Sequence, residues 1–191
     1  HKIISSNCVW DPSFNSQNSD NSVVSVVFFD DAENVFLHAI KYLPKLSEQV
    51  NNSLTNMEWQ INSVLEFAIE HHQNYLSIES NGIGKFLPEQ MRREIKKRKL
   101  NIGVGEIISH TSKIQRILGA FEPLLYAKRF YAQESLENSS FFREMSNFKP
   151  PIDSLDDVLD SVALAILEPR HLLGLYHKNR ESFCADTNFS I

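Results

Sequence analysis

The chain has 191 residues, of which 42% are hydrophobic and 23% charged, and its formal net charge at pH 7 is −5. This composition is typical of a soluble globular protein, and the length fits one domain with a sizeable core. No apolar run approaches the length of a membrane span, and the amino terminus lacks the pattern of a signal peptide. Two distant cysteines, Cys8 and Cys184, exclude a disulfide framework and indicate a reducing compartment, which we expect to be the cytoplasm.

Three strands are predicted in the first part of the chain. Residues 3–11 form an apolar run that ends at Trp10-Asp11-Pro12, where proline blocks continued pairing. Residues 23–29 are β-branched and aromatic, and residues 35–42 follow after a turn. This pattern predicts an antiparallel meander of three strands.

Helices and further strands then alternate along the chain. The apolar residues between Met57 and Ile69 recur at helical spacing. After them we expect a strand at 75–79, a basic helix at 88–99, a strand at 101–107, a helix at 114–121 opened by Thr111 or Ser112, a brief edge strand at 130–131, a short helix at 138–146 and a last helix at 154–167. The prediction is an α/β fold, a mixed five-stranded sheet flanked by helices, with residues 1–167 as the domain and 168–191 as an extension or tail.

Acidic residues lie where these elements begin or end. Asp11 ends the first strand, Glu79 ends the fourth, and Asp156, Asp157 and Asp160 open the last helix on one arc. Because the first and fourth strands are expected side by side, these carboxylates predict a cage for Mg²⁺ or Mn²⁺, and hence phosphoryl-transfer chemistry. Helix-start aspartates also serve as caps, so which of the three contacts metal stays open.

The order of these motifs resembles that of the ribonuclease H-like nucleases. More narrowly, it is similar to the carboxy-terminal nuclease domain of viral and phage large terminase subunits. The segments that resemble this family are Trp10-Asp11-Pro12-Ser13-Phe14 with Asp20, Ile78-Glu79-Ser80-Asn81-Gly82-Ile83-Gly84, Lys113-Ile114-Gln115-Arg116-Ile117 and Asp156-Asp157-Val158-Leu159-Asp160.

The resemblance implies a metal-dependent endonuclease that cuts concatemeric double-stranded DNA during viral genome packaging. Its metal-binding and catalytic acids would be Asp11, Glu79, Asp157 and Asp160, which would hold two Mg²⁺ or Mn²⁺ ions, and Asp20, in the loop after the first strand, is a further candidate ligand. Lys113 and Arg116 match a basic motif of the family at the DNA face. Lys85 and the basic run that follows it would meet phosphates, although such a run is also typical of a solvated helix face.

The implied partners are double-stranded DNA, an ATPase motor domain, a small terminase subunit and a portal, with no membrane, in a host cell infected by a phage. The family's ATPase motor motif is not found in these residues. Two alternatives stay open: a nuclease related to Holliday-junction resolvases and transposases, and a catalytically inactive DNA-binding or assembly module of the same fold.

Overall fold

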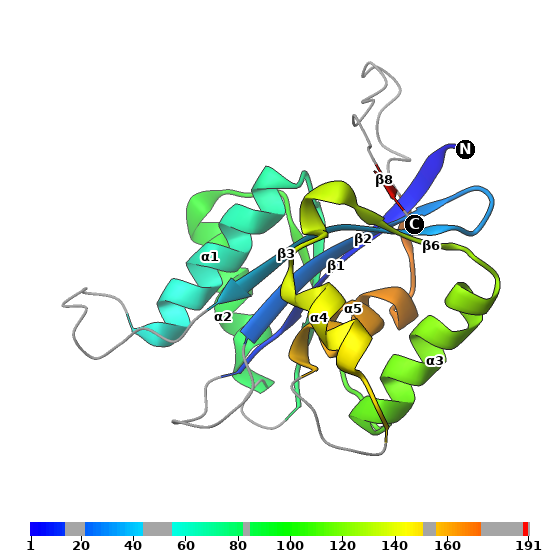
Figure 1. The fold of residues 1–191 in the computed structure, drawn as a ribbon. Coiled ribbons are helices and arrows are strands. Elements are labelled where there is room, and N and C mark those ends of the chain that lie inside the picture. Colours follow the sequence, from blue (N-terminus) through cyan, green and yellow to red (C-terminus); the bar gives the residue numbers. More distant parts are fainter. Residues whose placement is uncertain (14–21, 44–54, 82–84, 151–155, 173–188, 191) are drawn as a thin grey trace.

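A single mixed sheet with helices on both faces forms the protein (Figure 1). The computed structural model describes residues 1–13, 22–43, 55–81, 85–150, 156–172 and 189–190. The strands are β1 (Ile3–Asp11), β2 (Ser22–Asp30), β3 (Val35–Leu43), β4 (Tyr75–Glu79), β5 (Gly103–Ile107), β6 (Phe130–Gln133), β7 (His171–Leu172) and β8 (Phe189–Ser190). The helices are α1 (Asn56–Glu70), α2 (Leu87–Arg98), α3 (Lys113–Tyr126), α4 (Ser140–Asn147) and α5 (Asp157–Leu167), with a short 3₁₀ turn, η2 (Glu134–Leu136).

The strand order confirms the predicted mixed sheet. The order is β5-β4-β1-β2-β3-β6-β8, with β7 paired to β1. β1, β2 and β3 are antiparallel neighbours, whereas β4 runs parallel to β1 and β5 parallel to β4. In the β1–β4 register Trp10 pairs with Ile78, so that Asp11 and Glu79 end neighbouring strands, as the sequence predicted.

The sheet is larger than the five strands expected. β6 extends to Gln133 and pairs parallel to β3. Residues from the predicted extension add β7 and β8. Each has two residues, too few to show the alternation of apolar and polar side chains from which a strand is predicted. The boundary at residue 167 stays a prediction, and Asp20, Cys184, Ser154 and Leu155 lie outside the described residues.

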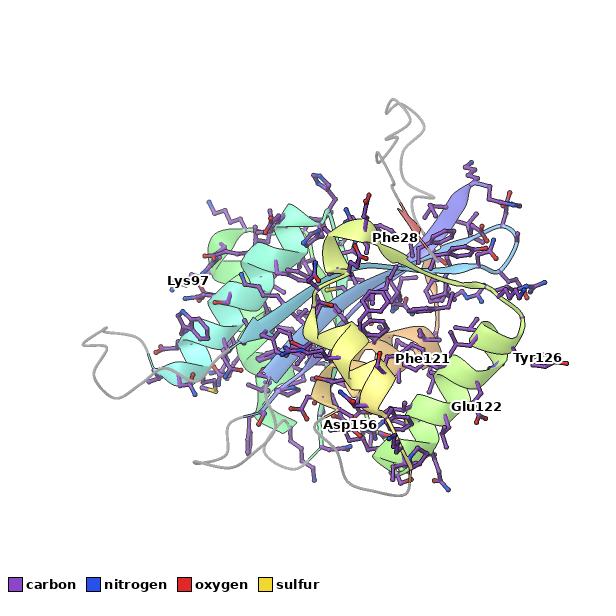
Figure 2. The ribbon with its side chains drawn as sticks, in the orientation of Figure 1. Phe28, Lys97, Phe121, Glu122, Tyr126 and Asp156 are labelled. Carbon is purple, nitrogen blue, oxygen red and sulfur yellow. The ribbon has the colours of Figure 1, made fainter. Side chains whose placement is uncertain are left out.

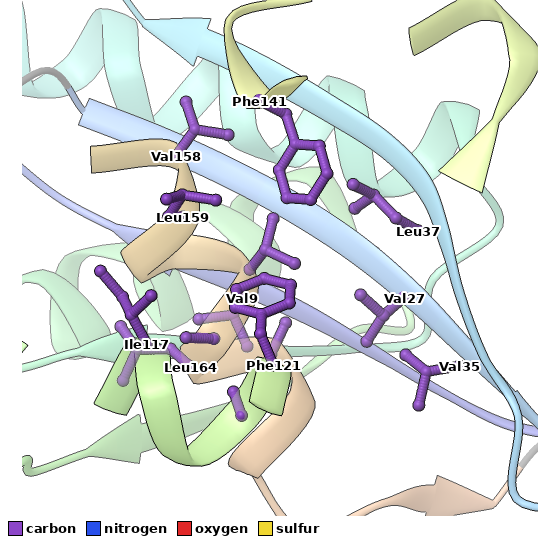
Figure 3. Close-up of a cluster of buried hydrophobic side chains, with 14 of the residues drawn as sticks. Val9, Val27, Val35, Leu37, Ile117, Phe121, Phe141, Val158, Leu159 and Leu164 are labelled. Atoms are coloured by element: carbon purple, nitrogen blue, oxygen red, sulfur yellow. The ribbon is translucent and has the colours of Figure 1, made fainter. Parts of the chain in front are cut away.

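Strand alternation divides the interior into two cores. Val9 packs in the core covered by α3, α4 and α5, which Figure 3 shows with Phe121, Phe141 and Leu159. Its neighbour Trp10 packs in the core covered by α1 and α2. Successive side chains of a strand point to opposite faces, so Asp11, the residue after Trp10, projects from the same face as Val9. Among the described residues, no helix is long and apolar enough to cross a membrane.

Candidate functional site

Asp11 and Glu79 meet at the carboxyl ends of two adjacent parallel strands. Asp11 follows Val9 by two residues and therefore projects from the face covered by α3, α4 and α5. Ile78 belongs to the opposite core, so Glu79 also projects toward α3 and α5. The two carboxyl groups lie close enough to interact, and Glu79 disfavours the ionised form of Asp11.

The surroundings of Asp11 disfavour its ionised form. Desolvation by the surrounding protein raises the pKa of this carboxyl well above its usual range, and the charge of Glu79 and the hydrogen bond to it raise the pKa further. Asp160 acts in the same direction, whereas the Lys113 ammonium lowers the pKa. Without cations, ionisation of Asp11 beside Glu79 is therefore unfavourable.

Helix α5 presents its first acids to this pair. Asp156, labelled in Figure 2, is the N-cap residue, and Asp157 and Asp160 lie in the first turn, all three buried. Burial raises the pKa of the Asp160 carboxyl against the lowering effect of Arg116, and Glu79 raises it further. Asp160 is thus electrostatically coupled to both strand-end acids.

Two cations of α3 lie against these acids. Lys113 Nζ lies 2.6 Å from Asp156 Oδ1 and donates to Asp157 Oδ1 at 2.9 Å. Arg116 Nε donates to Asp160 Oδ1 at 2.9 Å and Arg116 Nη2 donates to Asp160 Oδ2, a bidentate pair. Burial of Lys113 and Arg116 lowers the pKa of both groups, but the acids outweigh it and raise them above their usual values.

The loop after β5 holds Arg116 in place. Ser112 caps α3 by accepting from the Gln115 N–H, which agrees with one of the two predicted caps. Arg116 Nη1 donates to Ser109 Oγ at 2.7 Å and to the Thr111 carbonyl at 3.2 Å. It also lies 3.7 Å from Glu79 Oε1. Arg116 therefore joins α3, α5 and the end of β4.

Glu144, on α4, is a site residue that the sequence analysis missed. Its Oε2 accepts from the backbone N–H groups of Val158 and Leu159 at 2.9 and 3.1 Å, and Tyr42 Oη lies 3.5 Å from its Oε1. Burial raises the pKa of Glu144 to about 7, although the two backbone hydrogen bonds lower it. A glutamate in a short helix has no sequence signal for such a role, because its partners come from another element.

The predicted residues thus fall into two groups. Asp11, Glu79, Asp157, Asp160, Lys113 and Arg116 converge at one edge of the sheet. Lys85 is exposed in the turn before α2. Among the described residues, ligand atoms of three metal-ligating side chains come within 4.8 Å of one another at His1, Asp30 and Asp31, whereas the strand-end and α5 acids do not form such a group. There Asp30 accepts from the backbone of Ala32 and Asn34, as expected of a residue that organises the β2–β3 turn.

The chemistry of the convergent acids fits a hard divalent cation. All donors of the set are carboxylate oxygens, which Mg²⁺ and Mn²⁺ prefer. Because the pKa of Asp11 is raised, a cation that binds this carboxylate would have to displace its proton. Asp157 and Asp160 are paired with Lys113 and Arg116, so these pairs would have to open before either acid could bind a cation.

Comparisons with known proteins agree with this architecture. No protein-family model matches the chain, and no curated protein matches it. A mutant gp2c of the large terminase subunit from bacteriophage Sf6, solved with calcium, matches at 12% identity over 88% of this chain and 91% of that chain, with a TM-score of 0.57. A mutant nuclease domain of the large terminase subunit gp2 of the same virus, solved with manganese and beta-thujaplicinol, matches at 12% identity over 86% and 89%, with a TM-score of 0.53. The yeast mitochondrial Holliday junction resolvase Ydc2 matches at 12% identity over 86% and 79%, with a TM-score of 0.48.

At these identities the likeness concerns the fold. The chain has the ribonuclease H-like α/β fold that the sequence predicted, with solved terminase nuclease domains among the structures similar to it.

Proposed function

We propose that this protein is a metal-dependent endonuclease that hydrolyses DNA phosphodiester bonds. The main support is the convergence of Asp11 and Glu79, from adjacent parallel strand ends, with Asp160 from the first turn of α5. A divalent cation bound by such carboxylates supplies an activated water and stabilises the leaving oxygen of phosphodiester hydrolysis. Asp11, Glu79, Asp157 and Asp160 are the proposed ligands, and the two α5 acids bind the cation once Lys113 has released Asp157 and Arg116 has released Asp160.

The proposed biological role is that of a terminase nuclease, which cuts concatemeric double-stranded DNA during genome packaging. The two similar structures reported above with TM-scores above 0.5 both come from the large terminase subunit of bacteriophage Sf6, one of them described as its nuclease domain, and the matches cover 89% and 91% of those chains. Under this proposal the ATPase motor, small terminase subunit and portal are partners. Exposed Lys85 is proposed to contact phosphates directly, whereas Lys113 and Arg116 can do so only after leaving their acids.

Plasmid cleavage by the Asp11→Asn variant tests the proposed chemistry. Wild-type protein should nick or linearise supercoiled plasmid with Mn²⁺ or Mg²⁺, and EDTA should stop it. Asp11→Asn should abolish cutting yet remain folded, because asparagine keeps the volume and its amide can donate to Glu79. Asp31→Asn is the matched control, since Asp31 is exposed and interacts with the amino-terminal residues Lys2 and His1.

Three results would contradict this proposal in different ways. Full cleavage by Asp11→Asn would place the site elsewhere. Strong preference for a four-way junction over linear duplex would favour the resolvase-like alternative. Failure to cut any DNA with Mn²⁺ at high protein concentration would favour an inactive DNA-binding or assembly module.

A further inference from the structure

The amino-terminal turn of α5 is capped by another helix. The first N–H groups of any α-helix have no partner within the helix, and the N-cap side chain usually accepts from one of them. Asp156 occupies the N-cap position but makes no such hydrogen bond in the described structure. Its carboxylate instead lies 2.6 Å from Lys113 Nζ.

Glu144 fills the vacant capping role. Its Oε2 accepts from the N–H groups of Val158 and Leu159, the second and third residues of α5. These are the positions that an N-cap side chain normally serves. Helix α4 itself is fixed by Phe141, which is 1% exposed and packs in the core beside Phe121 and Phe130. The capping carboxylate is thus held by an element that is itself anchored in the core.

The capped turn is the one that holds the acids of the candidate site. Asp157 precedes Val158, and Asp160 follows Leu159, so that the two hydrogen bonds to Glu144 lie between the two acids. Fraying or rotation of this turn would move both carboxylates away from α3 and from the Asp11–Glu79 pair. Because Glu144 performs the capping, Asp156 is available to bind Lys113.

We propose that Glu144 is a positioning residue, which holds Asp157 and Asp160 in register for divalent-cation binding through its hydrogen bonds to the first turn of α5. This inference rests on the proposed function, since it assumes that the α5 acids bind the cation. It goes further by assigning a role to a residue of α4 that projects toward the site without belonging to the strand-end and α5 acids. Groups that orient metal ligands typically change metal affinity about 10- to 100-fold when they are removed.

The test compares Glu144→Ala and Glu144→Gln with Glu137→Gln, an exposed control from the same segment. Mn²⁺ affinity is measured by calorimetry, and the melting temperature is measured in EDTA. Glu144→Ala should bind Mn²⁺ at least about tenfold more weakly and melt roughly 2–4 °C lower. Glu144→Gln should bind Mn²⁺ within about threefold of wild type, because its amide oxygen can still accept from both N–H groups. Glu137→Gln should match wild type in both measurements.

The outcomes separate this inference from the proposed function. A Glu144→Ala variant that melts lower but binds Mn²⁺ like wild type would make Glu144 a stabilising cap only, and would overturn the inference. Equal loss of affinity in Glu144→Gln and Glu144→Ala would also overturn it, because the charge rather than the hydrogen bonds would then matter. Wild-type protein that binds Mn²⁺ but cuts no DNA would refute the nuclease proposal alone. Wild-type protein that binds no Mn²⁺ would refute both.

Discussion

The Arg116–Asp160 pair should make a large contribution to the stability of the metal-free protein. The side chains are only 10% and 5% exposed, and two parallel hydrogen bonds join them. Replacing Asp160 with alanine would leave the Arg116 guanidinium buried without its carboxylate partner. Removing one partner of a buried ion pair typically costs about 3–5 kcal/mol.

The lower end of that range applies to Asp160→Ala. Arg116 would keep its hydrogen bonds to Ser109 and Thr111 and its proximity to Glu79. We therefore expect a loss of about 3 kcal/mol in the free energy of unfolding. For a chain of this size that corresponds to a melting temperature lower by roughly 6–12 °C.

A double-mutant cycle isolates the interaction. Asp160→Ala, Arg116→Ala and the double variant are unfolded with urea in EDTA, so that metal binding does not contribute. The double variant should lose less than the sum of the single losses, with a coupling energy of about 2–3 kcal/mol, because neither charge is left without its partner. The exposed pair Arg129–Glu33, with side chains 46% and 70% exposed, is the matched control and should couple by less than about 1 kcal/mol.

Additive losses in the Arg116–Asp160 cycle would refute this reasoning. Additivity within about 0.5 kcal/mol would mean that the two side chains do not interact in solution. The contribution assigned to their burial would then be wrong, and Asp160 would be available to a cation without competition.

Two further predictions concern the raised pKa of Asp11 and the packing of β5. Because the pKa of Asp11 is raised, protonation of this carboxyl stabilises the folded protein in EDTA as pH falls toward the ordinary value of about 3.9. A cation must displace the same proton, so calorimetry should show Mn²⁺ affinity rising with pH, and a constant affinity from about pH 5 to 8 would contradict this. Gly103→Ala should destabilise the protein by about 1–3 kcal/mol, because the new Cβ would lie 2.6 Å from Tyr75 Cδ2 in a ring already stacked on His171. The control is Gly119→Ala in α3, where nothing lies within 4 Å of the new Cβ, so this substitution should stabilise the protein by about 0.8 kcal/mol. Equal melting temperatures of the two variants would contradict the packing argument.

Local patterns in the sequence were sufficient for most of the fold. The β-branched runs of β1, β2 and β3, the proline after Asp11 and the helical stripe of α1 each depend on residues close together in the chain. Such patterns report which side chains share one face of an element, so the element types were predicted correctly, and the cap of α3 is Ser112, one of the two candidates. The two-residue strands β7 and β8 were not predicted, because their pairing depends on partners far away in sequence.

The candidate site required the tertiary structure. The sequence placed Asp11 and Glu79 at strand ends. The resemblance implied that Lys113 and Arg116 lie at the DNA face, but it did not reveal the acids that these cations contact. These two cations lie 44 residues from the acids that they pair with.

Glu144 shows the same limit more sharply. It reaches α5 from a short helix whose own sequence predicts nothing about capping. Strand alternation and helical periodicity are properties of a single segment, and in this chain they indicate only the face of the element on which each side chain lies. The approach of Asp11 to Glu79, the buried ion pairs and the cap of α5 each join segments distant in sequence, so they were decided only when packing brought those segments together.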